Sequence, residues 1–155
     1  MKIVVDSNIV FSAILNSQGK IGQLIINGST HFKLFSIGLL KEEILNHKSK
    51  ILSISGLTQQ QFDKSLKAIT DRINFIDEIL ISDIDIRKAL DLVSGIDEKD
   101  TLFVALTNHL NAKLWTGDKK LVSGLSKKGY TKTISTEDLH KIFLEKQFKT
   151  QKRLK

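Results

Sequence analysis

Met1-Lys2-Ile3-Val4-Val5-Asp6-Ser7-Asn8 opens the chain, and this stretch decides the fold. A short apolar run ends at Asp6 and is followed at once by Ser7-Asn8, a pattern typical of a buried strand that leads into a helix. Open α/β sheets bind their ligands at the carboxyl ends of their strands. We therefore expect Asp6 to lie at the ligand-binding edge of a central strand.

Strand and helix patterns alternate along the rest of the chain. Apolar runs bounded by turn residues predict strands at residues 2–5, 32–36, 73–76, 113–116 and 131–134. Helical periodicity and capping residues predict helices at residues 8–15, 21–27, 39–51, 58–70, 83–93, 98–110, 119–126 and 136–148. Strands separated by helices favour parallel pairing with helices on both faces. The expected fold is an α/β, three-layer α/β/α sandwich with a central, mainly parallel sheet of four to five strands.

Length and composition fit a single globular domain. The chain has 155 residues, of which 41% are hydrophobic. The absence of Cys excludes disulfides, thiolate metal sites and a cysteine nucleophile. No segment approaches the roughly 20 apolar residues of a membrane helix, and the opening stretch does not resemble a secretion leader. We expect a cytoplasmic protein that does not enter a membrane.

The net charge of +7 is concentrated at the carboxyl end of the chain. Residues 146–155 carry five positive charges and no acid, which leaves 19 basic and 17 acidic residues, or +2, elsewhere. We therefore divide the chain into a domain at residues 1–145 and a basic tail at residues 146–155. Such a tail attracts phosphate backbones by releasing counterions, although a solvated terminus that aids solubility has the same composition.

Two further acids occupy positions comparable with that of Asp6. Asp118 ends the run Leu114-Trp115-Thr116-Gly117-Asp118, and Asp100 precedes a nearly all-apolar helical run. Asp97 suits a helix cap three residues before Asp100, whereas Asp100 is expected to face the core side of the helix. A helix cap is the structural alternative for Asp6 and Asp118 as well. The hydroxyl of Thr116 can bond a carboxylate or a water molecule.

A fourth acid is expected from the helix at residues 39–51. Glu43 and His47 lie four residues apart and border its apolar stripe, whereas Glu42 is rotated roughly 100° toward solvent. We therefore favour Glu43 as the inward-facing acid, with His47 as a supporting residue. A surface ion pair with Lys50 is the alternative for Glu43.

Four carboxylates at one edge of a sheet repel one another unless a divalent cation neutralises them. Ligation by oxygen alone suits Mg²⁺ or Mn²⁺. Phosphoryl transfer and phosphodiester hydrolysis use metals held in this way. The predicted metal ligands are Asp6, Glu43, Asp100 and Asp118, and Asn8 is placed to donate a hydrogen bond to one of them.

These motifs resemble those of the PIN domain family. Ile3-Val4-Val5-Asp6-Ser7-Asn8 resembles its first motif, Glu43-Ile44 its second, the stretch from Asp97 to Leu106 its third, and the stretch from Leu114 to Leu121 its fourth. The resemblance covers roughly residues 1–135. The residue sequence of the fourth motif is similar to that of small free-standing prokaryotic members of the family. The basic tail is not explained by the match.

The resemblance implies a metal-dependent endoribonuclease that hydrolyses RNA phosphodiester bonds. Asp6, Glu43, Asp100 and Asp118 would then be catalytic as metal ligands, and Lys119 and Lys120 would hold the RNA backbone. The resemblance further implies a homodimer and a small antitoxin protein as partner, because many family members are toxins of toxin–antitoxin pairs.

Two other functions are compatible with a strand-end acid. A phosphatase of the haloacid-dehalogenase type also uses Mg²⁺, but it requires a second Asp two residues after the first, where this chain has Asn8. A non-catalytic module that binds RNA or another partner needs none of the acids. The presence of all four therefore favours the nuclease.

Overall fold

Five parallel strands form the centre of the molecule. The structure is a computed structural model that describes residues 1–154. The sheet order is β3-β2-β1-β4-β5, and every neighbouring pair is parallel. The described strands are β1 (Lys2–Val5), β2 (Lys33–Ile37), β3 (Asn74–Ile76), β4 (Lys113–Trp115) and β5 (Thr133–Ile134). The expected α/β sandwich is confirmed, and all of its strand pairs are parallel.

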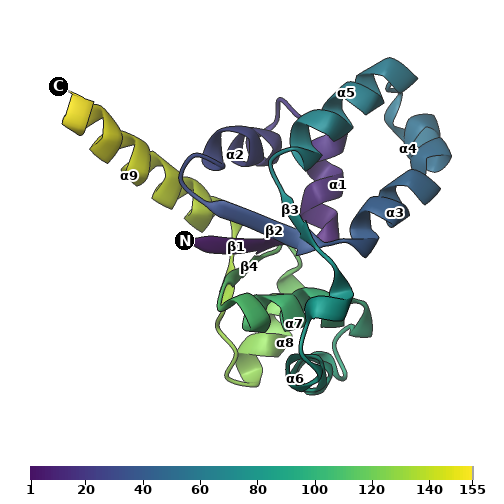
Figure 1. Cartoon of the computed structure of the whole chain (residues 1–155), viewed down its shortest axis with the longest axis vertical. Coiled ribbons are helices and arrows are strands. Elements are labelled where there is room, and N and C mark those ends of the chain that lie inside the picture. The colour runs from purple at the N-terminus through teal and green to yellow at the C-terminus, as the bar shows by residue number, and fades with distance from the viewer. Residues whose placement is uncertain (155) are drawn as a thin grey trace.

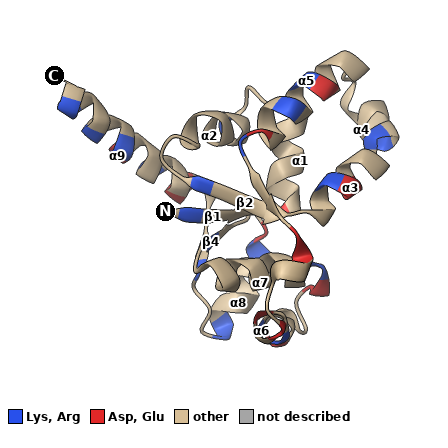
Figure 2. Ribbon diagram, in the orientation of Figure 1, with Lys and Arg blue, Asp and Glu red and all other residues tan. Residues whose placement is uncertain are grey.

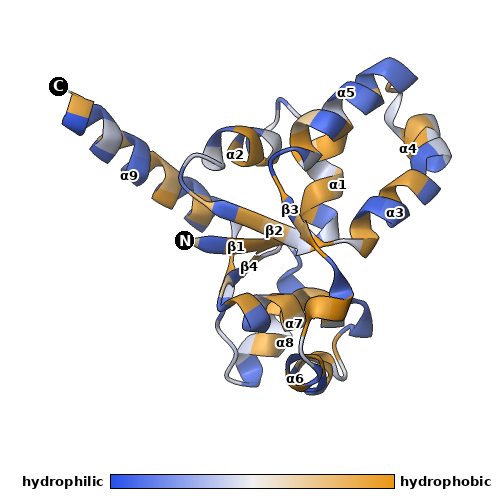
Figure 3. Ribbon diagram, in the orientation of Figure 1, coloured by the Kyte–Doolittle hydropathy of each residue, from blue (hydrophilic) through white to orange (hydrophobic). Residues whose placement is uncertain are grey.

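Strand β1 lies in the middle of the sheet with a strand on each side (Figure 1). Ile3, Val4 and Val5 are all 0% exposed, because helices cover both faces of the sheet. Figure 3 shows that β1 and β2 are hydrophilic at their first residue and hydrophobic along most of their remaining length. The apolar run before Asp6 is therefore a buried parallel strand.

Helices cover the two faces as separate layers (Figure 1). On one face α1 contacts α2 and α5, and α9 contacts α2. On the other face α7 packs against β1, β2 and β4, and α6 packs outside it against α7 and α8. The helices of these layers are α1 (Ser7–Leu15), α2 (Lys20–Gly28), α5 (Gln59–Thr70), α6 (Asp83–Val93), α7 (Thr101–Leu110), α8 (Lys119–Lys127) and α9 (Thr136–Leu154).

Three predicted helices differ from those observed. The predicted helix at residues 39–51 is broken at His47 into α3 (Leu39–Asn46) and α4 (Lys48–Ser55). The predicted helix at residues 98–110 begins with a short 3₁₀ turn, η2 (Glu98–Asp100), and continues as α7. A second 3₁₀ turn, η1 (Glu78–Leu80), precedes α6, which has the predicted bounds. Helix α9 continues to Leu154 and so crosses the boundary drawn at residue 145. The described part of the predicted tail is thus helical.

Between residues 1 and 154, no single helix is long and apolar enough to span a membrane. Helices α1 and α2 reach the required length and composition only as a pair bent by 102°.

Gly22 in α2 is predicted to be essential for the turn between α1 and α2. A Cβ at this position would lie 2.4 Å from the carbonyl oxygen of Ser17 and 2.7 Å from its Cα, so backbone must shift. Gly22→Ala should therefore destabilise the fold by about 1–3 kcal/mol, although helix propensity alone favours Ala by about 1 kcal/mol. Chemical denaturation measures the change in the free energy of unfolding.

Gly124→Ala is the matched control within α8. A Cβ there meets only side-chain atoms of Ile96, whose far end lies 2.5 Å away and can rotate. We expect a smaller loss of stability than for Gly22→Ala. Equal stability of the Gly22→Ala variant and the unsubstituted protein would show that this turn adapts.

Candidate metal centre

Asp6 lies directly after the central strand and is only 3% exposed. Its backbone N–H donates to the carbonyl of Trp115 over 3.2 Å, which continues the β1–β4 pairing. Its carboxylate accepts a hydrogen bond of 2.9 Å from the N–H of Ile9 and so caps α1. The same side chain is therefore both a helix cap and a buried acid at the carboxyl edge of the sheet.

Asp118 occupies the matching position after β4. Its carboxylate accepts a hydrogen bond of 3.1 Å from the N–H of Leu121 and caps α8. Its own N–H donates to the hydroxyl oxygen of Thr116 over 3.1 Å. Because β1 and β4 are parallel neighbours, Asp6 and Asp118 lie at the same edge.

Asp100 reaches this edge from the start of α7, where it is half-buried. Burial, together with the negative charges of Asp97, Asp6 and Asp118, raises the pKa of its carboxyl to about 6. Burial also raises the pKa of Asp6, as does the charge of Asp118, whereas hydrogen bonds from Thr116 and the N–H of Ile9 lower it. These three carboxyl groups thus share one electrostatic environment.

Asp97 and Thr116 support this cluster in the expected ways. The carboxylate of Asp97 accepts a hydrogen bond of 3.0 Å from the N–H of Lys99 and caps η2. Thr116 is 2% exposed and bonds both Asp6 and the backbone of Asp118. It therefore links the two strand-end acids.

The helical pattern predicts that Glu43 and His47 face inward. Both side chains are exposed instead. Leu40 and Ile44 make the buried face of α3. The charges that raise the pKa of Asp100 are those of Asp97, Asp6 and Asp118, and that of Glu43 is not among them. The break at His47 turns the chain into α4 and leaves His47 at the junction of the two helices.

Asn8 and the two lysines of the predicted RNA contact lie at the rim. Asn8 is exposed on the first turn of α1. Lys119 and Lys120 are exposed on the first turn of α8, directly after Asp118. Their positions place positive charge beside the acids.

The donor set fits a hard divalent cation in its chemistry. Asp6, Asp100 and Asp118 supply oxygen ligands and repel one another when all are ionised. However, within residues 1–154 no three His, Asp or Glu side chains are already arranged as a ligand set. A cation bound here would therefore have to draw the carboxylates closer together.

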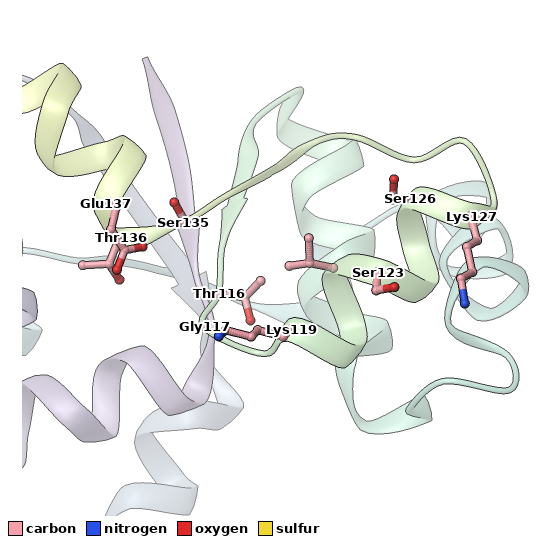
Figure 4. Close-up of a pocket in the computed structure, with 10 residues that line it drawn as sticks. Thr116, Gly117, Lys119, Ser123, Ser126, Lys127, Ser135, Thr136 and Glu137 are labelled. Atoms are coloured by element: carbon pink, nitrogen blue, oxygen red, sulfur yellow. The ribbon is translucent and has the colours of Figure 1, made fainter.

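A cavity of about 550 Å³ opens beside the acids between α8 and the start of α9 (Figure 4). Thr116, Gly117 and Lys119 line its end nearest the acids. The remainder is lined from α8 by Val122, Ser123, Ser126 and Lys127, and from the start of α9 by Ser135, Thr136 and Glu137. Sequence reasoning missed these residues, although the sequence Ser135-Thr136-Glu137 directly after the last strand is a signal for the same edge.

A family model described as PIN domain matches residues 4–142. The chain belongs to the PIN domain family. Members of this family are typically nucleases. The match includes Asp6, Glu43, Asp100 and Asp118 and ends within α9.

A search of curated proteins finds no match to this PIN domain. Among solved structures, one that resembles it is the crystal structure of VapBC2 from Rickettsia felis bound to a DNA fragment from their promoter. The TM-score is 0.62 at 16% sequence identity, and the alignment covers 87% of this chain and 97% of that chain. At this identity the likeness supports the fold alone.

The raised pKa of Asp100 predicts that this acid destabilises the metal-free protein at neutral pH. Between about pH 4 and 6 the folded protein holds a proton that the unfolded chain has released, so stability falls as pH rises through this range. In chelator at pH 7, Asp100→Asn should raise the melting temperature by about 2–4 °C, or roughly 1 kcal/mol after allowance for solvent screening. Below pH 4 the gain should vanish.

Asp91→Asn is the control, because Asp91 is an exposed acid on α6 away from the cluster. Its melting temperature should follow that of the unsubstituted protein at every pH. A gain from Asp100→Asn that is the same at pH 4 and pH 7 would contradict the electrostatic origin of the effect.

Proposed function

We propose that this PIN domain is a Mg²⁺- or Mn²⁺-dependent endoribonuclease that hydrolyses RNA phosphodiester bonds. The main support for the proposal is that Asp6, Asp100 and Asp118 lie close enough at the carboxyl edge of the sheet for their charges to affect one another. Burial and repulsion between the acids oppose the ionisation of Asp6 and Asp100, and a bound cation would offset both effects. We further propose Glu43 as a fourth, more distant ligand that approaches when the cation binds.

A divalent cation, when bound, supplies a Lewis acid that activates water and stabilises charge on a phosphodiester. The carboxylate of Asp6 is held in direction by the N–H of Ile9 and the hydroxyl of Thr116. Asp118 is held by the N–H of Leu121 in the same way. Asp100 enters from a different element, so the three acids surround the edge from β1, β4 and α7.

The RNA strand is proposed to cross this edge and enter the cavity between α8 and α9. Lys119 and Lys120 lie next to Asp118 and offset the repulsion between the acids and the phosphates. The hydroxyls of Ser123 and Ser135 are suited to hydrogen bonds with ribose or phosphate oxygens (Figure 4). Specificity for RNA would then arise in this cavity.

We also propose that the protein is the toxin of a toxin–antitoxin pair, acts as a homodimer and works in the cytoplasm. Support comes from membership of the PIN domain family and from the likeness in fold to VapBC2. Co-expression with the product of a small neighbouring reading frame tests this proposal. Suppressed RNA cleavage and co-purification are expected, and cleavage unchanged by every such product would contradict it.

A phosphatase of the haloacid-dehalogenase type is the less favoured alternative. Asn8 occupies the position where that chemistry needs a second Asp. A non-catalytic module on the same fold is also less favoured, because Asp6, Asp100 and Asp118 are all retained in one environment. Turnover of a small phosphate ester but not of RNA would favour the phosphatase.

Asp6→Asn and Asp100→Asn should each lower the rate of RNA cleavage in Mn²⁺ by about 10²–10³-fold, because each removes a charge that holds the cation. Chelation with EDTA should abolish cleavage by the unsubstituted protein. Time courses on a labelled single-stranded RNA, with melting temperatures measured in parallel, test both expectations. Cleavage that persists in EDTA would overturn the metal-dependent mechanism.

Glu42→Gln and Glu43→Gln form a matched pair within the same experiment. Both acids are exposed on α3 and adjacent in sequence, so both changes remove one charge from the same surface. A ligand role for Glu43 predicts loss of cleavage for Glu43→Gln alone. Equal activity of the two variants would remove Glu43 from the proposed metal centre.

A further inference from the structure

Basic residues mark the start of every strand, at the edge of the sheet opposite the acids. Strands β1, β2 and β4 begin with Lys2, Lys33 and Lys113, Lys132 immediately precedes β5, and Arg72 lies two residues before β3. We call these five residues the N-edge band: Arg72, Lys33, Lys2, Lys113 and Lys132. All five are exposed.

The strand register brings these residues into one row. Lys2 is paired with Lys33 across β1 and β2, and Lys113 lies one strand further along, opposite Ile3. The sheet order continues this row to Arg72 on one side and Lys132 on the other. Adjacent strands are about 4.8 Å apart, so five strand starts span roughly 20 Å. The strand starts therefore lie along one edge of the sheet, and their side chains project toward both faces, because Lys113 is level with Ile3 and not with Lys2.

The charges of the band are not neutralised by ion pairs among the described residues. Lys2 donates to the carbonyl of Leu110 over 3.5 Å, and Lys132 donates to the side-chain oxygen of Asn111 over 3.3 Å. Both partners are neutral. Asp71, next to Arg72, forms its ion pair with Lys67 at 2.8 Å.

Two acids of α6, Asp85 and Asp91, border the band at one end. They line a cavity together with Lys132. Asp85 lies 3.3 Å from the ring of His109. Lys88 lines the same cavity, so this end of the band carries charges of both signs.

Helix α9 extends the band away from the acidic edge. It begins beside the carboxyl end of β4, where Trp115 donates its indole N–H to the hydroxyl of Thr136 over 3.0 Å. With a rise of about 1.5 Å per residue, its 19 residues reach roughly 28 Å from that point. Its outer part projects from the body on the side where the chain starts (Figure 1).

The outer part of α9 is strongly basic. Between residues 146 and 154 it carries Lys146, Lys149, Lys152 and Arg153 and no acid. Figure 2 shows Lys and Arg along this part of α9 and at the first residues of β1 and β2. Positive charge therefore gathers at the end of the molecule opposite the carboxylate cluster.

We propose that the N-edge band and the outer part of α9 bind the phosphate backbone of a nucleic acid. A polyanion is repelled by the metal-free acidic edge but attracted to this surface, where bound Na⁺ or K⁺ counterions of the nucleic acid are released. The contacts are made by long, flexible ammonium groups, which recognise phosphate charge rather than base sequence. This surface goes beyond the proposed nuclease activity and does not depend on it.

Binding of labelled single-stranded RNA and DNA of equal length and sequence, measured by fluorescence anisotropy in EDTA, tests the proposal. The test variant is the full chain with Lys33→Gln, Lys113→Gln and Lys132→Gln. Its affinity for both strands should fall at least tenfold. Between about 50 and 200 mM salt, its slope of log affinity against log salt should be shallower by about 2, because three phosphate contacts are lost.

A triple variant with Lys20→Gln, Lys50→Gln and Lys64→Gln is the matched control. These exposed lysines lie on α2, α4 and α5, and the three changes remove the same total charge as those in the band. The control should retain the affinity and salt slope of the unsubstituted protein. Melting temperatures of both triple variants check that the fold is retained.

Equal losses of affinity in both triple variants would show that binding depends on net charge alone, and this result would overturn the proposal. Unchanged binding by the band variant would overturn it as well, as would band-dependent binding to anionic phosphatidylserine vesicles without binding to nucleic acid. None of these results bears on metal-dependent cleavage. Failure of this inference is therefore distinguishable from failure of the proposed nuclease.

Discussion

Parallel hydrogen bonding on both sides of β1 is the constraint on which the candidate site depends. Because β2 and β4 run in the same direction as β1, their carboxyl ends meet at one edge. Asp6 and Asp118 therefore lie close together although 112 positions separate them in the sequence. The covering helix α7 brings Asp100 to the same edge. The same pairing gathers the lysines of the strand starts at the opposite edge, so the direction of the sheet gives the molecule an acidic end and a basic end.

The acids of the cluster also stabilise the elements that hold them. Asp6 caps α1 and Asp118 caps α8, each by accepting a backbone N–H bond. These caps fix the carboxylates in direction, which a cation site requires. The two interpretations of each acid, as helix cap or as ligand, are thus compatible. Burial of Asp6 and Asp100 nevertheless opposes their ionisation. The ionised carboxylates that a cation needs as ligands therefore lower the stability of the metal-free fold.

Local patterns in the sequence were sufficient for the strands and for the convergence of Asp6, Asp100 and Asp118. Apolar runs identify buried strands, and the acid that follows each run must lie at the carboxyl edge if the strands are parallel. The exposure of Glu43 was not predictable in this way, because it depends on how α3 packs and on the break at His47. The cavity side chains were missed for a related reason. Ser123 and Ser135 become neighbours of one cavity only through the packing of α8 against the start of α9.

The pairing of β1 with β4 has a consequence for synthesis of the chain. Ile3 leaves the ribosome long before Lys113, its partner on β4. Until that segment has been synthesised, β1 lacks β4 as its neighbour on one side, and Asp118, which follows β4, is absent from the chain. Translation at about 5–20 residues per second therefore leaves the unfinished chain for several seconds without a complete acidic edge. A copy of the chain that is terminated before β4 would therefore lack both Asp118 and the strand that holds it beside Asp6.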